Sequence, residues 1–249
     1  MKTLTTLFLL LTLSMLAQTP KIRPLSELIN KKEPAWALFL EKAIKEATNH
    51  VEVLPKDNRK ADSALYKAQI TTRSPLGAIV YETGGLLIDH GWIRILGSGS
   101  TKLDRSLMAW NKGKTFEKDF DGLPFVLVAD DVLGGFFAVN SGGGIDSVGI
   151  GKVFYFAPEN LLWTNLEISY SEFLYFCFSG DIKGLYKGFY WTGWEKDIAL
   201  MNGNQGMSCY PFLWSKEGSD INKVSRKPVP IEELWTLNNS SRMQLGIGK

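Results

Sequence analysis

The chain has 249 residues, of which 45% are hydrophobic and 22% charged, and its formal net charge is +2. This length suits one large domain or two small ones, and the apolar fraction is enough for a sizeable core. The near-neutral charge and the lack of a long basic run in the sequence argue against nucleic acid as a partner.

The first 19 residues have the layout of a secretory signal peptide. Lys2 provides a positive start, Leu4 to Leu16 is mostly apolar, and small or polar residues precede Pro20. The apolar run of 13 residues is shorter than the ~20 residues that span a bilayer. We therefore predict a signal peptide over residues 1–19, with an uncleaved N-terminal helix as the alternative. The mature protein is then periplasmic or secreted, without a stable transmembrane anchor.

The mature chain begins with helical patterns. Residues 34–49 carry an apolar stripe with a period of 3.6 residues. Asp57 is a suitable N-cap for a second helix over 57–69, and Ser74-Pro75 opens a short third helix that ends before Gly84.

From Leu86 the pattern changes to that of strands. Asp89–Gly91 predicts a tight hairpin turn, and the glycine-rich stretch 141–151 predicts a loop. Because turns rather than helices join these strands, we expect a mainly antiparallel sheet. The predicted strands cover residues 86–88, 92–96, 125–129, 136–140 and 153–156.

Helical patterns return after the sheet. Ser169 and Glu172 fit a capping box for a helix that ends at Gly180, and residues after Asn239 are expected to fray. Further elements are predicted as a helix over 191–200, a strand over 207–214 and a last helix introduced by Pro228 and Pro230. The fold is therefore predicted to be α+β. Residues 20–249 form a single domain with helices packed on one face of a twisted, mainly antiparallel sheet.

Two cysteines, Cys177 and Cys209, lie in apolar surroundings in the sequence. An exported protein can form a disulfide, but small buried thiols are the favoured interpretation here.

The sequence predicts no catalytic residue, no metal site and no cofactor. His50 and His90 lie in different predicted elements without a nearby cysteine or histidine, so a zinc site is not indicated. Gly142–Gly144 lacks the following Gly-Lys-Ser/Thr of a phosphate loop. No Gly-x-Ser-x-Gly nucleophile motif follows a predicted strand.

Asp130 and Asp131 are adjacent acidic residues and form the clearest candidate acidic pair in the sequence. We interpret both as turn residues, because Asp caps its own backbone in turns, while binding of a cation or partner is the alternative. Gly134 and Gly135 predict a turn with positive φ or a close backbone approach. On this interpretation Gly135→Val should lower the free energy of unfolding by about 1–3 kcal/mol through backbone strain. Asp130→Asn should lower the free energy of unfolding by about 1 kcal/mol or less.

Most tryptophans are expected to fill the core, although a sugar-binding platform is an alternative. The pair in Trp191-Thr-Gly-Trp194 is the best candidate to remain partly exposed.

Several motifs occur together in one order and resemble an uncharacterised bacterial family of domains of unknown function, DUF2625, over about residues 25–237. They include Tyr81-Glu-Thr-Gly-Gly85, Asp89-His-Gly-Trp92, Val128-Ala-Asp-Asp-Val-Leu-Gly-Gly-Phe-Phe-Ala-Val-Asn140 and Tyr210-Pro-Phe-Leu-Trp214. This resemblance implies no catalytic residue, because the family has no established activity.

A more distant similarity is to the SUKH superfamily, many of whose members are immunity or partner-binding proteins of bacterial toxin systems. It rests on the order of Asp130–Asn140, Val153–Pro158 and Ser171–Leu174. The leader predicted over residues 1–19 argues against a role as a cytoplasmic immunity protein.

Two functional hypotheses follow. The first is a non-enzymatic, exported, SUKH-like protein that binds a protein partner. The alternative is an envelope hydrolase or carbohydrate-binding protein, which needs at least two of the candidate carboxylates in one cleft. The candidate partner- or ligand-binding residues are Glu82, Asp89, His90, Trp92, Asp130 and Asp131.

Overall fold

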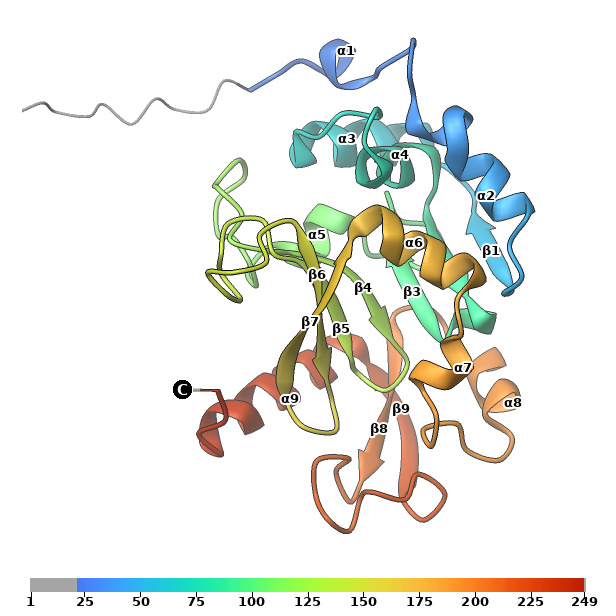
Figure 1. The fold of residues 1–249 in the computed structure, drawn as a ribbon, viewed down its shortest axis with the longest axis vertical. Coiled ribbons are helices and arrows are strands. Elements are labelled where there is room, and N and C mark those ends of the chain that lie inside the picture. Colours follow the sequence, from blue (N-terminus) through green and yellow to red (C-terminus); the bar gives the residue numbers. More distant parts are fainter. Residues whose placement is uncertain (1–21, 249) are drawn as a thin grey trace, which may run out of the picture.

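The computed structural model describes residues 22–248 as an α+β fold around a seven-stranded antiparallel sheet (Figure 1). The predicted signal peptide lies outside these residues. Each strand pairs with its neighbours in the sequence, so the sheet is a meander in the order β1 to β7. The strands are β1 (Val51–Leu54), β2 (Gly85–Ile88), β3 (Ile93–Leu96), β4 (Val126–Asp131), β5 (Phe136–Val139), β6 (Lys152–Ala157) and β7 (Leu162–Ser169).

A second, two-stranded sheet is formed by β8 (Gln205–Tyr210) and β9 (Ser225–Pro230). The α-helices are α1 (Leu25–Leu28), α2 (Glu41–Lys45), α3 (Asn58–Ala68), α4 (Pro75–Glu82), α5 (Leu107–Asn111), α6 (Tyr170–Ser179), α7 (Ile182–Leu185), α8 (Trp194–Ala199) and α9 (Ile231–Gln244). A π-helical turn, η1 (Trp36–Leu40), precedes α2, and a 3₁₀ turn, η2 (Asp89–Gly91), joins β2 to β3.

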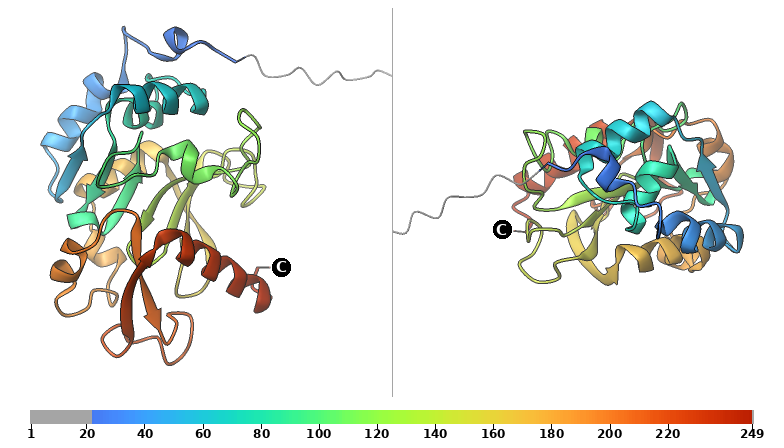
Figure 2. Two further views of the ribbon diagram at one scale, coloured as in Figure 1. Left: turned by 180° about the vertical axis from the view of Figure 1, so that it is seen from behind. Right: turned by 90° about the horizontal axis from the view of Figure 1, so that it is seen from above.

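Helices cover both faces of the large sheet, so the expectation of a single covered face was wrong. Two adjacent residues of β5 show this, because successive side chains of a strand point to opposite faces. Phe136 meets Trp235 of α9 at a centroid distance of 4.9 Å, and Phe137 meets Phe173 of α6 at 4.8 Å. Figure 2 shows α9 and the β8–β9 hairpin in front when the molecule is seen from behind.

The predicted helix starts at Asp57 and Ser74 are confirmed. The Asp57 carboxylate accepts hydrogen bonds from the backbone N–H groups of Arg59 and Lys60 at 2.9 and 3.0 Å. Ser74 Oγ accepts one from Gly77 at 3.1 Å. These contacts satisfy N–H groups that have no partner inside a helix.

Other predicted boundaries are corrected by the structure. The helix predicted over 34–49 ends at Lys45 and is followed by β1. The last helix continues to Gln244 and does not fray after Asn239. Three strands, β1, β7 and β9, lie where none was predicted.

Cys177 and Cys209 are both buried, and both are free thiols in the structure. Their prediction as core residues is confirmed. Burial raises the pKa of the Cys209 thiol to about 11, so the reactive thiolate is disfavoured. Within residues 22–248, no helix has the length and apolar character to cross a membrane.

The capping box at α6 yields a stability prediction. Ser169 Oγ accepts a hydrogen bond from the Glu172 backbone N–H at 3.3 Å, and the Glu172 carboxylate accepts one from the Ser169 backbone at 2.7 Å. Ser169→Ala should therefore lower the unfolding free energy by about 1 kcal/mol, measured by urea unfolding. Ser179→Ala, at the exposed last turn of the same helix, is the control. Equal unfolding midpoints for the two variants would contradict the capping role.

Candidate functional site

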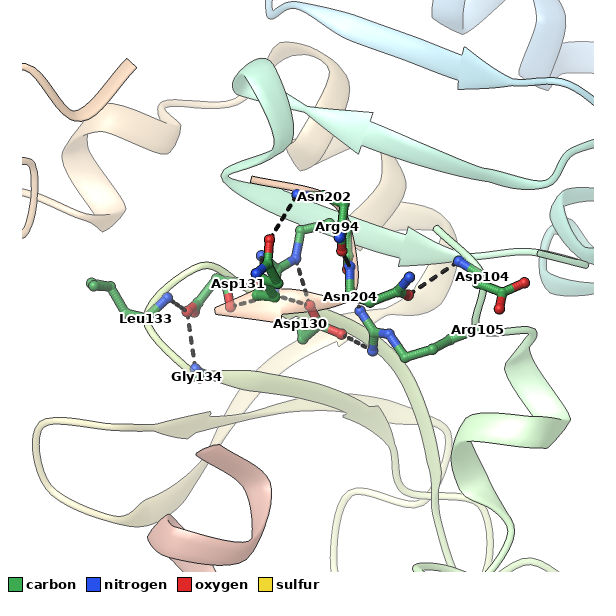
Figure 3. Close-up of polar contacts among 12 residues, drawn as sticks. Arg94, Asp104, Arg105, Asp130, Asp131, Leu133, Gly134, Asn202 and Asn204 are labelled. Atoms are coloured by element: carbon green, nitrogen blue, oxygen red, sulfur yellow. Dashed lines mark hydrogen bonds and ion pairs between the residues drawn. The ribbon is translucent and has the colours of Figure 1, made fainter. Parts of the chain in front are cut away.

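Asp130 lies at the centre of a buried ionic cluster. Its side chain is 0% exposed, and its two oxygens face two different arginines (Figure 3). Oδ1 accepts a hydrogen bond from Arg94 Nε at 2.6 Å and also pairs with Nη2 of Arg94. Oδ2 accepts one from Arg105 Nη1 at 2.5 Å. The prediction of Asp130 as a turn residue is therefore wrong, because it is a strand residue that neutralises buried cations.

The two arginines also hold the segment that leads into β8. Arg94 Nη1 donates to the carbonyl of Gln205 at 2.9 Å, and Arg105 Nη2 donates to the carbonyl of Gly203 at 2.8 Å. Arg94 belongs to β3, where its backbone is directly opposite Asp130. One carboxylate thus fixes two guanidinium groups that join the small sheet to the large one.

Asp131 faces away from Asp130 and serves the turn, as predicted. Its Oδ1 accepts hydrogen bonds from the backbone N–H groups of Leu133 and Gly135, both at 2.9 Å. Its Oδ2 accepts from the hydroxyls of Tyr155 at 2.7 Å and Tyr186 at 3.0 Å. Burial raises the pKa of the Asp131 carboxyl, while these hydrogen bonds act in the opposite direction. Burial and the nearby Asp131 raise the pKa values of both tyrosines.

The remaining predicted candidates lie elsewhere. Glu82 is the last residue of α4 and pairs with Lys56 at 3.3 Å. Trp92 is fully buried in an aromatic cluster with Tyr186, Tyr190, Trp191 and Trp194. The expectation that the pair Trp191 and Trp194 is exposed is wrong for Trp191, which is buried, while Trp194 is half-buried.

Asp89 and His90 form the corner between β2 and β3. Both adopt positive φ values, 46° and 61°, which are uncommon for residues other than glycine. The Asp89 carboxylate accepts a hydrogen bond from Tyr190 at 3.1 Å. The His90 ring stacks on the His50 ring with 4.3 Å between the ring centroids. The sequence did not predict this contact, because the two residues lie in different elements. In the described part of the chain, no three histidine, cysteine or acidic side chains form a group that could hold a metal ion.

The structure does not bring two candidate carboxylates into one cleft. Asp130 and Asp131 are buried and leave β4 in opposite directions, as successive strand residues do. Glu82 and Asp89 are separated by the length of β2, Gly85–Ile88. The geometry that the hydrolase alternative requires is therefore not found among these residues.

A groove that sequence reasoning missed follows the short helix α5. It consists of three adjoining hollows of about 270, 390 and 360 Å³. The first and second share Lys67 in their walls, and the second and third share Asp104 and Ala109. We call these three hollows together the α5 groove.

The α5 groove is rich in cations. Six basic side chains line it against three acidic ones, whereas the whole chain has a net charge of only +2. The basic residues are Arg23, Arg59, Lys60, Lys67, Arg105 and Lys114, and the acidic residues are Asp104, Asp121 and Glu232.

One signal for this groove was present in the sequence. Arg59, Ser63 and Lys67 are spaced four residues apart on the predicted second helix, and therefore share one face of it. At 1.5 Å per residue, the two cations are separated by about 12 Å along the axis of α3. The remaining cations come from distant parts of the sequence, so their convergence could not be predicted.

Comparison with known proteins identifies the family of this chain. The profile of the family described as "Protein of unknown function DUF2625" matches residues 25–234. An "Uncharacterized protein" of Haemophilus influenzae is 41% identical over 219 residues, covering 87% of this chain and 94% of its own length. The "Putative uncharacterized protein YbfG" of Escherichia coli is also 41% identical over 219 residues, covering 87% and 95%. No solved structure matches the chain. The chain therefore belongs to the DUF2625 family of proteins of unknown function.

Proposed function

We propose that this protein is an exported, non-enzymatic binding protein whose α5 groove receives an extended acidic segment of a partner protein. The observation that carries this proposal is the twofold excess of cations in the groove. A basic, hollowed surface attracts acidic segments and fixes their register through complementary charges.

The non-enzymatic part rests on how the fold uses its buried carboxylates. All four oxygens of Asp130 and Asp131 accept hydrogen bonds from protein groups. Carboxylates held in this way stabilise the structure and are not presented to a substrate.

Export and the distant SUKH relationship are parts of the same proposal. The leader pattern over residues 1–19 supports export. The hairpin β4–β5 followed by β6 and α6 supports the SUKH-like order. Fractionation of cells that make the full chain with a C-terminal tag tests export. Recovery of the unprocessed chain from the cytoplasm would contradict it.

The binding proposal predicts that the purified mature protein binds a labelled oligoglutamate peptide in fluorescence polarisation. The complex should weaken as salt concentration rises, because salt screens exposed charges. The double variant Arg59→Glu with Lys67→Glu should bind about ten-fold or more weakly, because it reverses two groove cations.

The matched control is Lys31→Glu with Lys32→Glu. This variant changes the net charge equally, at exposed positions that do not line the groove. It should bind the peptide about as well as the unmodified protein. Equal loss of binding in both double variants would show that only net charge matters, and would overturn the groove as the site.

A further inference from the structure

The end of the α5 groove nearest α9 differs from the rest, because its cations are largely covered by their neighbours. The hollow of about 360 Å³ is lined by Arg105, Trp110, Lys114 and Glu232. The side chain of Lys114 is 9% exposed and that of Arg105 is 12% exposed. Lys114 Nζ lies 4.1 Å from the Trp110 ring centroid, and Arg105 Cζ lies 4.5 Å from it. Packing against the indole thus holds both cations in place.

Two buried donors in these walls have no hydrogen-bond partner among the described residues. They are Arg105 Nε and Trp110 Nε1. The other two nitrogens of Arg105 are used by Asp130 and by the Gly203 carbonyl. Buried polar groups are rarely left unpaired in folded proteins. Both atoms are enclosed, with less than 1 Å² of exposed surface, so a ligand in the hollow meets the two cations and not these donors.

Glu232 shows which chemistry this hollow accepts. Its carboxylate lies 2.8 Å from Lys114 Nζ, but its own side chain is 56% exposed. The largely covered ammonium is therefore neutralised by a carboxylate that reaches it from the solvent side. Such a half-exposed pair is held weakly, so another carboxylate can compete for the same cation.

The rest of the wall favours a carboxylate over a phosphate dianion. Ala109, Pro230 and Ile231 contribute apolar surface, and Asp104 adds a negative charge. A doubly charged group would be repelled by Asp104 and Glu232 and would not be solvated by the apolar wall. A single carboxylate on an aliphatic stem matches both features.

We propose that this hollow is a carboxylate subsite, in which an acidic side chain of the partner protein replaces Glu232 as the counter-ion of Lys114. The inference rests on the proposed function, since it names the chemistry by which one end of the α5 groove recognises its partner. Glu232 then acts as an internal competitor that sets the affinity.

The oligoglutamate peptide tests this inference. Glu232→Gln removes the competitor and should tighten binding roughly two- to five-fold. Glu233→Gln is the matched control, because it removes an equal charge at the adjacent exposed position and should bind like the unmodified protein. Lys114→Met keeps the aliphatic packing without the charge and should weaken binding at least about ten-fold.

A titration with acetate separates a partner carboxylate from a free one. In ¹⁵N-labelled protein, acetate should shift the Trp110 indole resonance, more in Glu232→Gln than in Glu233→Gln and not in Lys114→Met. If acetate shifts Trp110 but oligoglutamate does not bind, the subsite serves a small carboxylate and the protein-partner assignment is overturned. If Glu232→Gln and Glu233→Gln behave alike with both probes, the subsite itself is overturned. Normal peptide binding by Arg59→Glu with Lys67→Glu would instead overturn the proposed function.

Discussion

Asp130→Asn is expected to lower the free energy of unfolding by about 3–5 kcal/mol. The neutral amide leaves Arg94 and Arg105 without their shared counter-charge, although their side chains are only 2% and 12% exposed. Burial already lowers the pKa of Arg105, which shows that its charge is costly at this position. Guanidinium unfolding of the purified protein, followed by tryptophan fluorescence, measures the change.

The control for this variant is Asp104→Asn. Asp104 is an exposed carboxylate that pairs with Lys60 at 3.3 Å, so its loss should change stability by about 0.5 kcal/mol or less. If Asp130→Asn and Asp104→Asn unfold at the same guanidinium concentration, the ionic cluster does not stabilise the fold by this amount. A small effect was expected when Asp130 was interpreted from the sequence as a turn residue, and the buried cluster reverses that expectation.

Gly135→Val should destabilise the protein by about 3 kcal/mol or more, at or above the upper end of the sequence-based range. A Cβ atom at this position would lie 2.2 Å from Asp131 Oδ2 and 2.3 Å from the Tyr155 hydroxyl. It would therefore separate these two groups, which form a 2.7 Å hydrogen bond. The physical reason is steric overlap and not backbone strain, because the positive φ of 82° belongs to the preceding residue, Gly134.

Gly122→Val is the control for Gly135→Val. A Cβ atom at Gly122 would meet nothing within 4 Å, so the same substitution should be almost neutral there. Thermal melts of the two purified variants measure the difference. Equal melting temperatures for Gly135→Val and Gly122→Val would show that the turn accommodates the added side chain without loss of stability.

Much of the fold could be predicted because local signals agreed with it. Ser74, Ser169 and Asp57 are capping residues whose role depends on their immediate neighbours. The β2–β3 hairpin was likewise marked by a change of period and by turn residues at Asp89–Gly91. Such features need no knowledge of the rest of the chain.

The missed strands lack this local signature. β1 has four residues, and its apolar residues continue the pattern of the preceding helix. β7 contains Thr164, Asn165 and Glu167 and is the last strand of the sheet, where exposed polar residues are tolerated. β9 contains Pro228 and Pro230, which usually oppose a strand but are acceptable in a two-stranded hairpin.

The candidate site was harder to predict because its residues converge from distant positions. Asp130 is separated by 36 residues from Arg94 and by 25 from Arg105. The useful sign was an arginine between Ile93 and Ile95, since a charge inside a buried strand requires a partner. The acidic pair at the end of β4 supplied that partner.

The meander of the large sheet has a consequence for the order in which the molecule can assemble. Each of its strands pairs only with strands adjacent in the sequence, so every new strand can extend an edge that already exists. The longest loops that these pairings close run from Leu54 to Gly85 and from Leu96 to Val126, and loops of this length close faster than longer ones. The segment that follows α8 is different, because Gly203 and Gln205 are bonded to arginines that lie about a hundred residues earlier. These bonds of the ionic cluster can therefore form only after most of the chain has been made. They form when the small sheet docks on the large one.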